Sequence, residues 1–141
     1  MAYMNQEKKQ VIKQALDKVL KPLGFKFSLK VYHSSKISLT IRSGPIDFIN
    51  DHLEYIKTEK PWDFNDDMAK YMKDRNYMSI NQYWYNENYT KKTAELIGKI
   101  VQAMKSADWF DKSDAMVDYF HTAYYYDINV GQWDKPYQVT K

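Results

Sequence analysis

Strict alternation of apolar and polar residues between Phe25 and Arg42 is the feature that most limits what this chain can fold into. Apolar residues occupy every second position in 25–31 and again in 37–41, and Lys, Ser or Thr stand between them. Because the side chains of a β-strand point alternately to the two faces of a sheet, this pattern predicts two strands, each apolar on one face. The short polar segment 33–35 between them predicts a hairpin.

The polar face of this hairpin is basic. A three-residue loop sets Lys26 opposite Arg42 and Lys30 opposite Ser38. Like charges that face each other across a strand pair are mildly destabilising, so we expect an acidic group in this protein or in a partner to compensate them. The candidate face for nucleic acid or an acidic partner consists of Lys26, Lys30, Lys36 and Arg42.

Two amphipathic helices are expected. Apolar residues recur at helical spacing in 6–21 and in 90–107, and each run places them along one stripe. Asn5 is the expected N-cap of the first helix, and Asn88 or Thr90 that of the second.

The segment between the hairpin and the second helix has a weaker pattern. Residues 46–56 fit either a short helix or a packed loop, and Asp66 or Asp67 is a candidate N-cap for a short helix over 68–73. Residues 77–85 predict a third strand, but large side chains on both of its faces leave open which one is buried.

The aromatic segment 124–130 predicts the last strand, closed by a turn over 131–136. The order helix, strand, strand, mixed segment, strand, helix, strand indicates an α+β fold. We expect a two-layer sandwich, in which a mostly antiparallel sheet of about four strands carries two main helices on one face. With 141 residues and no linker-like stretch, residues 1–141 are expected to form a single domain.

Composition limits the class of protein. The chain has no cysteine, no run of 18 apolar residues and no signal-peptide pattern at its start, so we expect a cytoplasmic protein without disulfides. The net charge of +3 is unevenly distributed: residues 1–42 carry nine basic and two acidic residues, 43–90 five and nine, and 91–141 seven and seven. The basic field therefore belongs to the first third of the chain.

No catalytic motif is present. The three histidines have no metal-ligand spacing, and the four glycines form no phosphate-binding loop. Asp118 and His121 are three residues apart, which suits either a base with its orienting carboxylate or a structural histidine, and the structural role is the commoner one. We therefore expect a protein that is not an enzyme and assign no catalytic, cofactor-binding or metal-binding residue.

Binding remains as the function, in two forms. The basic hairpin face, with Tyr32 and residues 83–85 for base stacking, suits nucleic acid. A surface rich in Tyr and Trp suits a protein partner, because such side chains anchor interfaces. The candidate aromatic interaction surface consists of Tyr83, Trp84, Tyr85, Tyr125 and Trp133.

Four phrases of the sequence, within 42–48, 78–84, 118–120 and 126–137, carry a resemblance to a family. The chain resembles small uncharacterised proteins of bacteriophages and plasmids that are related to large polyvalent protein-associated domains. The resemblance implies an accessory or anti-defence protein of a mobile element that engages a host protein. It implies no site residues. Nucleic-acid binding through the basic hairpin is the alternative.

Overall fold

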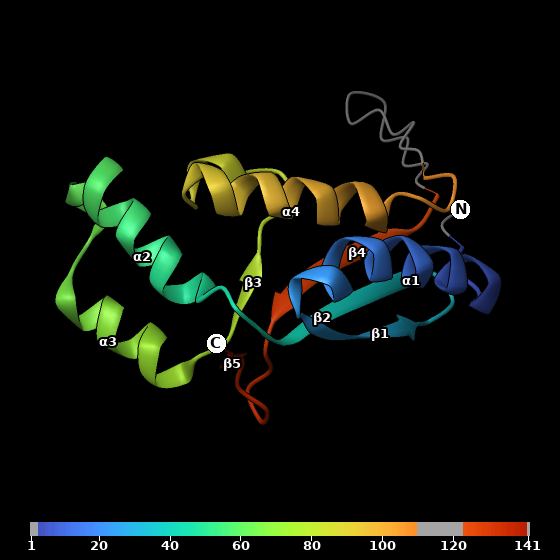
Figure 1. Ribbon diagram of the computed structural model, residues 1–141, viewed down its shortest axis with the longest axis horizontal. Helices are drawn as coiled ribbons and strands as arrows, with labels where there is room; N and C mark the ends of the chain where they lie inside the picture. The colour runs from blue at the N-terminus through green and yellow to red at the C-terminus, as the bar shows by residue number, and fades with distance from the viewer. Residues whose placement is uncertain (1–2, 110–122, 141) are drawn as a thin grey trace.

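The computed structural model describes residues 3–109 and 123–140, which form four α-helices and a sheet of five strands (Figure 1). The α+β class predicted from the sequence is confirmed. In chain order the elements are α1 (Gln6–Leu20), η1 (Lys21–Leu23), β1 (Lys26–Tyr32), β2 (Lys36–Gly44), α2 (Phe48–Glu59), η2 (Pro61–Asp63), α3 (Asp66–Arg75), β3 (Met78–Ile80), η3 (Tyr85–Glu87), α4 (Lys91–Met104), β4 (Tyr125–Val130) and β5 (Gln138–Val139).

The sheet is mixed, which corrects the mostly antiparallel sheet of about four strands expected above. Its order is β1-β2-β4-β3, and β5 pairs with the end of β2. β1 with β2 and β3 with β4 are antiparallel, whereas β2 runs parallel to both β4 and β5. Parallel pairing needs a long crossover connection, and α2, α3, β3 and α4 lie in the chain between β2 and β4. Alternation within a strand reports which face is buried but not the direction of its neighbour.

The predicted hairpin is present, with one change of register. His33 and Ser34 both have positive φ, 53° and 54°, as a tight hairpin turn requires. Lys30 stands opposite Ser38, as predicted, but Lys26 pairs with Ser43 and not with Arg42. A bulge next to Phe27 leaves Arg42 as the extra residue of β2, so the expected opposition of two cations does not occur.

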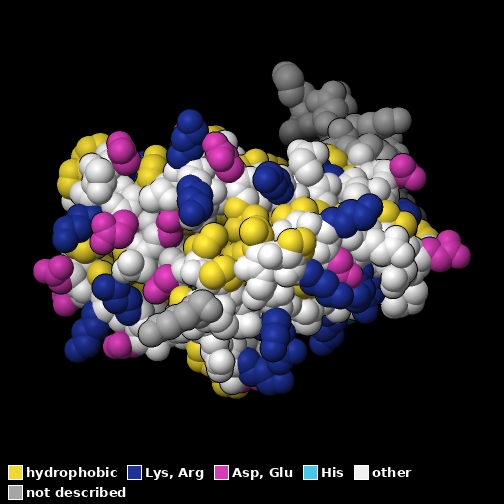
Figure 2. Space-filling view, viewed as in Figure 1, with side chains coloured by type: hydrophobic (Ala, Val, Ile, Leu, Met, Phe, Trp, Pro, Cys, Tyr) yellow, Lys and Arg dark blue, Asp and Glu magenta, His cyan; other side chains and the backbone are white. Residues whose placement is uncertain are grey.

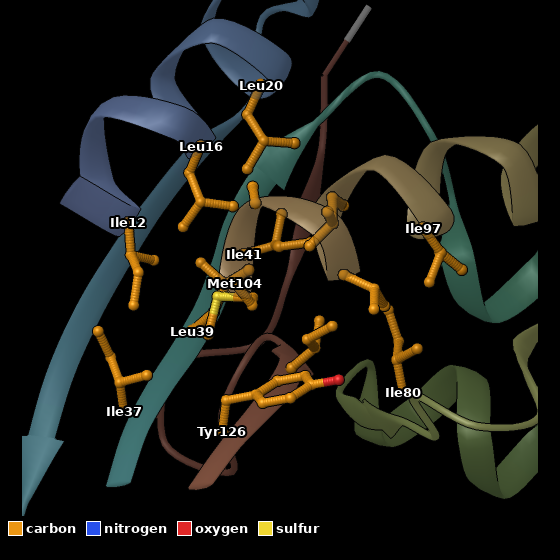
Figure 3. Close-up of a cluster of buried hydrophobic side chains, with 14 of the residues drawn as sticks. Ile12, Leu16, Leu20, Ile37, Leu39, Ile41, Ile80, Ile97, Met104 and Tyr126 are labelled. Atoms are coloured by element: carbon orange, nitrogen blue, oxygen red, sulfur yellow. The ribbon is translucent and has the colours of Figure 1, made fainter. Parts of the chain in front are cut away.

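The main core lies between one face of the sheet and the helices α1 and α4 (Figure 3). The predicted apolar stripe of α4 is confirmed as buried, and that of α1 is buried at Ile12, Leu16 and Leu20 and half-buried at Ala15 and Val19. The fully buried residues of α1 and β2 are Ile12, Leu16, Leu20, Ile37, Leu39 and Ile41. From β4 the inward side chains are Tyr126, Ile128 and Val130, and α4 contributes Ile97, Ile100, Val101 and Met104. The predicted apolar face of β2 is therefore buried, whereas Phe27, Leu29 and Val31 of the edge strand β1 are half-buried.

The middle of the chain is helical where the sequence pattern left a helix and a packed loop as alternatives. Residues of the ambiguous segment 46–56 fall in α2, which packs with α3 around a smaller cluster of Ile49, Leu53 and Ala69. The N-cap of α3 is Asn65, whose side chain accepts a hydrogen bond from the backbone N–H of Met68 at 2.7 Å, and not Asp66 or Asp67.

The third strand is much shorter than 77–85. It ends at Ile80, because the side chain of Asn81 accepts hydrogen bonds from the backbone N–H groups of Tyr83 and Trp84 at 2.9 and 3.2 Å. Such an Asx turn replaces the strand ladder with a local turn. Ile80 is buried and Ser79 is exposed, which settles the face of this strand.

The first helix is capped as predicted, and the last is capped across the fold. Asn5 accepts a hydrogen bond from the backbone N–H of Lys8 at 2.8 Å. Thr90 makes no cap of its own; instead Asp51 of α2 accepts from the backbone N–H and the hydroxyl of Thr90, at 2.9 and 2.7 Å, and from the hydroxyl of Thr93 at 2.7 Å. One carboxylate thus joins α2 to the start of α4.

Replacing Asp51 by alanine removes three hydrogen bonds to a charged acceptor and leaves two hydroxyls and an N–H without their partner. We expect Asp51→Ala to lower the free energy of unfolding by about 2 kcal/mol. Denaturant unfolding followed by circular dichroism measures this. The exposed Asp74 serves as the matched control, since Asp74→Ala should change stability by less than about 0.5 kcal/mol. Equal effects of the two variants would show that Asp51 is not a structural cap.

Buried tyrosines predict a loss of stability in alkali. Burial raises the pKa of Tyr124 and Tyr126 from 10.0 to about 12, and near Tyr126 the hydroxyls of Tyr83 and Tyr85 add to the effect. A raised pKa in the folded state means that the neutral form is stabilised. The contribution of these tyrosines to the free energy of unfolding is therefore fully present below pH 10 and is lost as the pH rises towards about 12.

Thermal unfolding midpoints measured at increasing pH should fall above about pH 10, where unfolded tyrosines ionise. Tyr126→Phe removes one ionisable group without removing a hydrogen bond of that hydroxyl among the described residues, so its midpoint should fall less steeply. Identical slopes for the variant and the wild type would contradict the assignment of this pH dependence to Tyr126.

Candidate functional site

The face of the sheet opposite the core is polar, and its centre is a hydrogen-bonded network. Asp127 of β4 pairs with Lys36 of β2 at 2.7 Å and accepts hydrogen bonds from the hydroxyl of Ser38 and, at 3.0 Å, from the amide of Asn129. Asn129 in turn accepts a hydrogen bond from Ser79 of β3 at 2.9 Å. The network spans three strands and fixes these side chains. It also neutralises Lys36, the only one of the four predicted cations with an ion pair in residues 3–109 and 123–140.

The other three predicted cations lie on the same face and are exposed. No carboxylate of the described chain lies within 4.0 Å of the charged nitrogens of Lys26, Lys30 or Arg42. Lys30 rests on the ring of Tyr32, with its Nζ 4.9 Å from the ring centre. These cations therefore retain their charge at the surface, where an anion can reach them.

A turn after β4 brings a further cation, Lys135, to this face. The backbone N–H of Gly131 donates to the carbonyl of Ile41 at 2.9 Å, and Gln132 and Lys135 form a reciprocal pair of backbone hydrogen bonds that closes the turn. Beyond the turn, the hydroxyl of the buried Tyr137 donates to the carbonyl of Ile46 at 2.7 Å. Both ends of the turn are thus fixed to β2 and to the segment that follows it.

Arg42 and Lys135 meet at a small polar hollow. Its lining consists of Ser28, Thr40, Arg42, Gln132 and Lys135. Ser28 and Thr40 form a cross-strand pair of the hairpin, and the other three come from the bulge and the turn. A wider groove continues from Arg42 and Lys135 past Lys26 to Lys13 and Lys21 of the first helical segment. In Figure 2, Lys and Arg side chains gather on the side of β1 and of this turn.

Gln132 and Lys135 are not among the residues that the sequence predicts for the basic face. The turn itself was predicted, but nothing in the sequence places a turn after the last strand beside the N-terminal hairpin. The parallel pairing of β4 with β2 brings them together.

The candidate aromatic surface divides into two groups. Tyr83 and Trp84 follow β3 beside the start of β4, at the same end of that strand as Tyr125, whereas Trp133 follows its other end. A strand of six residues, about 20 Å long, separates the groups. Four of the five are exposed, at 73% for Tyr83, 56% for Trp84, 52% for Tyr125 and 79% for Trp133. The fifth, Tyr85, packs against the core, so it is not part of an open surface.

The pair of Asp118 and His121, considered above for catalysis, lies outside the described residues, since both fall in 110–122. His52 has a structural environment: its Nδ1 is 2.7 Å from the carbonyl of Asn88, and its ring packs on Tyr89. Within the part of the chain that the structure covers, no three His, Cys, Asp or Glu residues are grouped so that they could hold a metal ion. No helix in that part has the length and apolar character needed to cross a membrane.

Comparison of the chain with protein-family models, with curated proteins and with solved structures finds no match in any of the three.

The turn that carries Lys135 depends on Gly131. Its φ is +69°, and a Cβ at this position would lie 2.5 Å from the backbone nitrogen of Tyr137. Gly24 has a similar φ, +86°, but a Cβ there meets nothing within 4 Å. Gly24→Ala should therefore lower the free energy of unfolding by about 1 kcal/mol, because alanine disfavours a positive φ. Gly131→Ala should lower it by this amount and by an additional steric contribution.

Chemical denaturation of both variants measures this difference, and the amide resonances of 131–137 should shift in Gly131→Ala alone. If the two substitutions cost the same, the close approach of Gly131 and Tyr137 is not a constraint on the turn.

Proposed function

We propose that this protein binds single-stranded nucleic acid through the polar face of its sheet. The observation that carries the proposal is the grouping of Lys26, Lys30, Arg42 and Lys135 on that face, with no ion pair to any of them in the described residues. Phosphate contacts from Lys and Arg supply most of the affinity of non-specific nucleic-acid binding. Hydroxyl groups between the cations provide further donors to phosphate oxygens.

Access to this face follows from the two-layer arrangement that we infer for the molecule. Helices α1 and α4 lie on the apolar face, and the outward residues Lys26, Lys30, Arg42 and Tyr125 are exposed. A nucleic-acid strand then lies across β1 and β2, as on other binding domains that present an open sheet.

Exposed aromatic residues favour a single strand over a duplex. Trp133 projects from the same turn as Lys135 and is 79% exposed. Its ring offers a surface on which an unpaired base can stack, which is the usual complement to a basic groove in proteins that bind single strands. Bases within a duplex are already stacked on each other and are not available for this contact.

A protein partner is the second candidate function. Tyr83, Trp84 and Tyr125 supply exposed aromatic side chains at one end of β4, and such residues frequently anchor interfaces. A phage or plasmid origin and a host protein as the partner stay predictions from the resemblance. Binding at this aromatic group should depend weakly on salt, which separates it from binding at the basic face.

Titration of a fluorescein-labelled thymidine oligonucleotide tests the proposal, with fluorescence anisotropy read between about 50 and about 200 mM salt. We expect saturable binding, with log K falling linearly against log salt concentration. The triple variant Lys26→Gln, Lys30→Gln and Arg42→Gln should reduce this slope by more than about 1 and at most about 2, since each phosphate contact that is lost on a single strand contributes about 0.7.

The matched control is the triple variant Lys70→Gln, Lys91→Gln and Lys99→Gln, at exposed positions of α3 and α4, which changes the net charge equally. It should retain most of the affinity and nearly the same slope. Absence of saturable binding by the wild type, or an equal loss in both triple variants, would reject the basic face as a nucleic-acid site.

A further inference from the structure

The polar hollow beside Arg42 has the composition of a site for a single oxyanion. Each of its five lining side chains carries a hydrogen-bond donor, and none is acidic. Its cavity volume is about 100 Å³, enough for several water molecules. It therefore suits a group of a few heavy atoms and not a nucleobase with its sugar.

The backbone that carries the donors is fixed before any ligand arrives. Ser28 and Thr40 are held opposite each other by the hairpin ladder, and the bulge in β2 frees Arg42 from cross-strand pairing. Gln132 and Lys135 are held by the closed turn, which the hydrogen bond from Gly131 to Ile41 fixes to β2. A ligand therefore loses affinity to the ordering of the side chains and not to that of the backbone that carries them.

The donors also have no internal partners within the described chain. The hydroxyls of Ser28 and Thr40 make no hydrogen bond there, whereas those of Ser38 and Ser79 on the same face do. The lining of the wider groove, in contrast, contains two acids. There Asp17 is paired with Lys13 at 3.0 Å and lies 3.7 Å from Lys21, and Asp134 lines the groove but not the hollow.

We propose that the hollow binds one phosphate group of the nucleic-acid backbone, which Arg42 and Lys135 hold jointly while Ser28 and Thr40 donate to its oxygens. This inference rests on the proposed function and adds the position of one phosphate. Trp133, two residues before Lys135, then lies next to the nucleotide that carries this phosphate. The site thus fixes the register of the strand on the sheet.

Joint binding has a consequence that independent contacts lack. The single variants Arg42→Gln and Lys135→Gln and the double variant are titrated with the same labelled oligonucleotide across the same salt range. If both residues hold one phosphate, the double variant reduces the log–log salt slope by about 0.7 in total. If they contact separate phosphates, the reduction is about 1.4.

The hydroxyl is tested by Thr40→Val, which keeps the shape of the side chain and removes a neutral donor. We expect the dissociation constant to rise several-fold with the salt slope unchanged, whereas Thr58→Val, at an exposed position of α2, should leave both unchanged. Thermal unfolding of each variant confirms that it is folded.

The outcomes separate the two proposals. Absence of oligonucleotide binding by the wild type rejects the proposed function and this inference with it. Normal wild-type binding combined with a double-variant reduction near 1.4, or with no effect of Thr40→Val, leaves the nucleic-acid function standing and overturns the shared phosphate site.

Discussion

The parallel pairing of β2 with β4 is the contact on which both sides of this molecule depend. On the apolar face it aligns Ile37, Leu39 and Ile41 with the inward side chains of β4, so that α1 and α4 cover a continuous surface. On the polar face it places Ser38 opposite Asp127, which organises the central network. The hydrogen bond from Gly131 to Ile41 extends this pairing and places the turn with Lys135 beside the hairpin. One strand pair therefore joins the N-terminal basic hairpin to the end of the chain.

Local features of this fold were accessible from the sequence because they arise from local physics. Asn5 caps a helix through its own side chain, and the alternation in β1 and β2 reports which face is buried. The long-range features were not accessible. Asp51 caps α4 from 39 residues away, and the direction of β4 relative to β2 is set by the crossover between them. Neither leaves a periodic signal.

The candidate site shows the same division. Lys26, Lys30 and Arg42 follow from the outward positions of a predicted hairpin, and the structure places them on one face. The predicted cross-strand partner of Lys26 was wrong, because a bulge adds only one residue to a strand and leaves the alternation nearly intact. The aromatic set was grouped by residue type alone, and the strand β4 separates Trp133 from the other exposed members.

The distance along the chain between the two halves of the polar hollow has a consequence for synthesis. Ser28, Thr40 and Arg42 belong to a hairpin that leaves the ribosome about ninety residues before Gln132 and Lys135. Until β4 is made, β2 has an open edge, and Arg42 lacks the turn residues that line the hollow with it. The proposed phosphate site is therefore complete only once both segments are present, and the hairpin alone carries positive charge without a defined binding site.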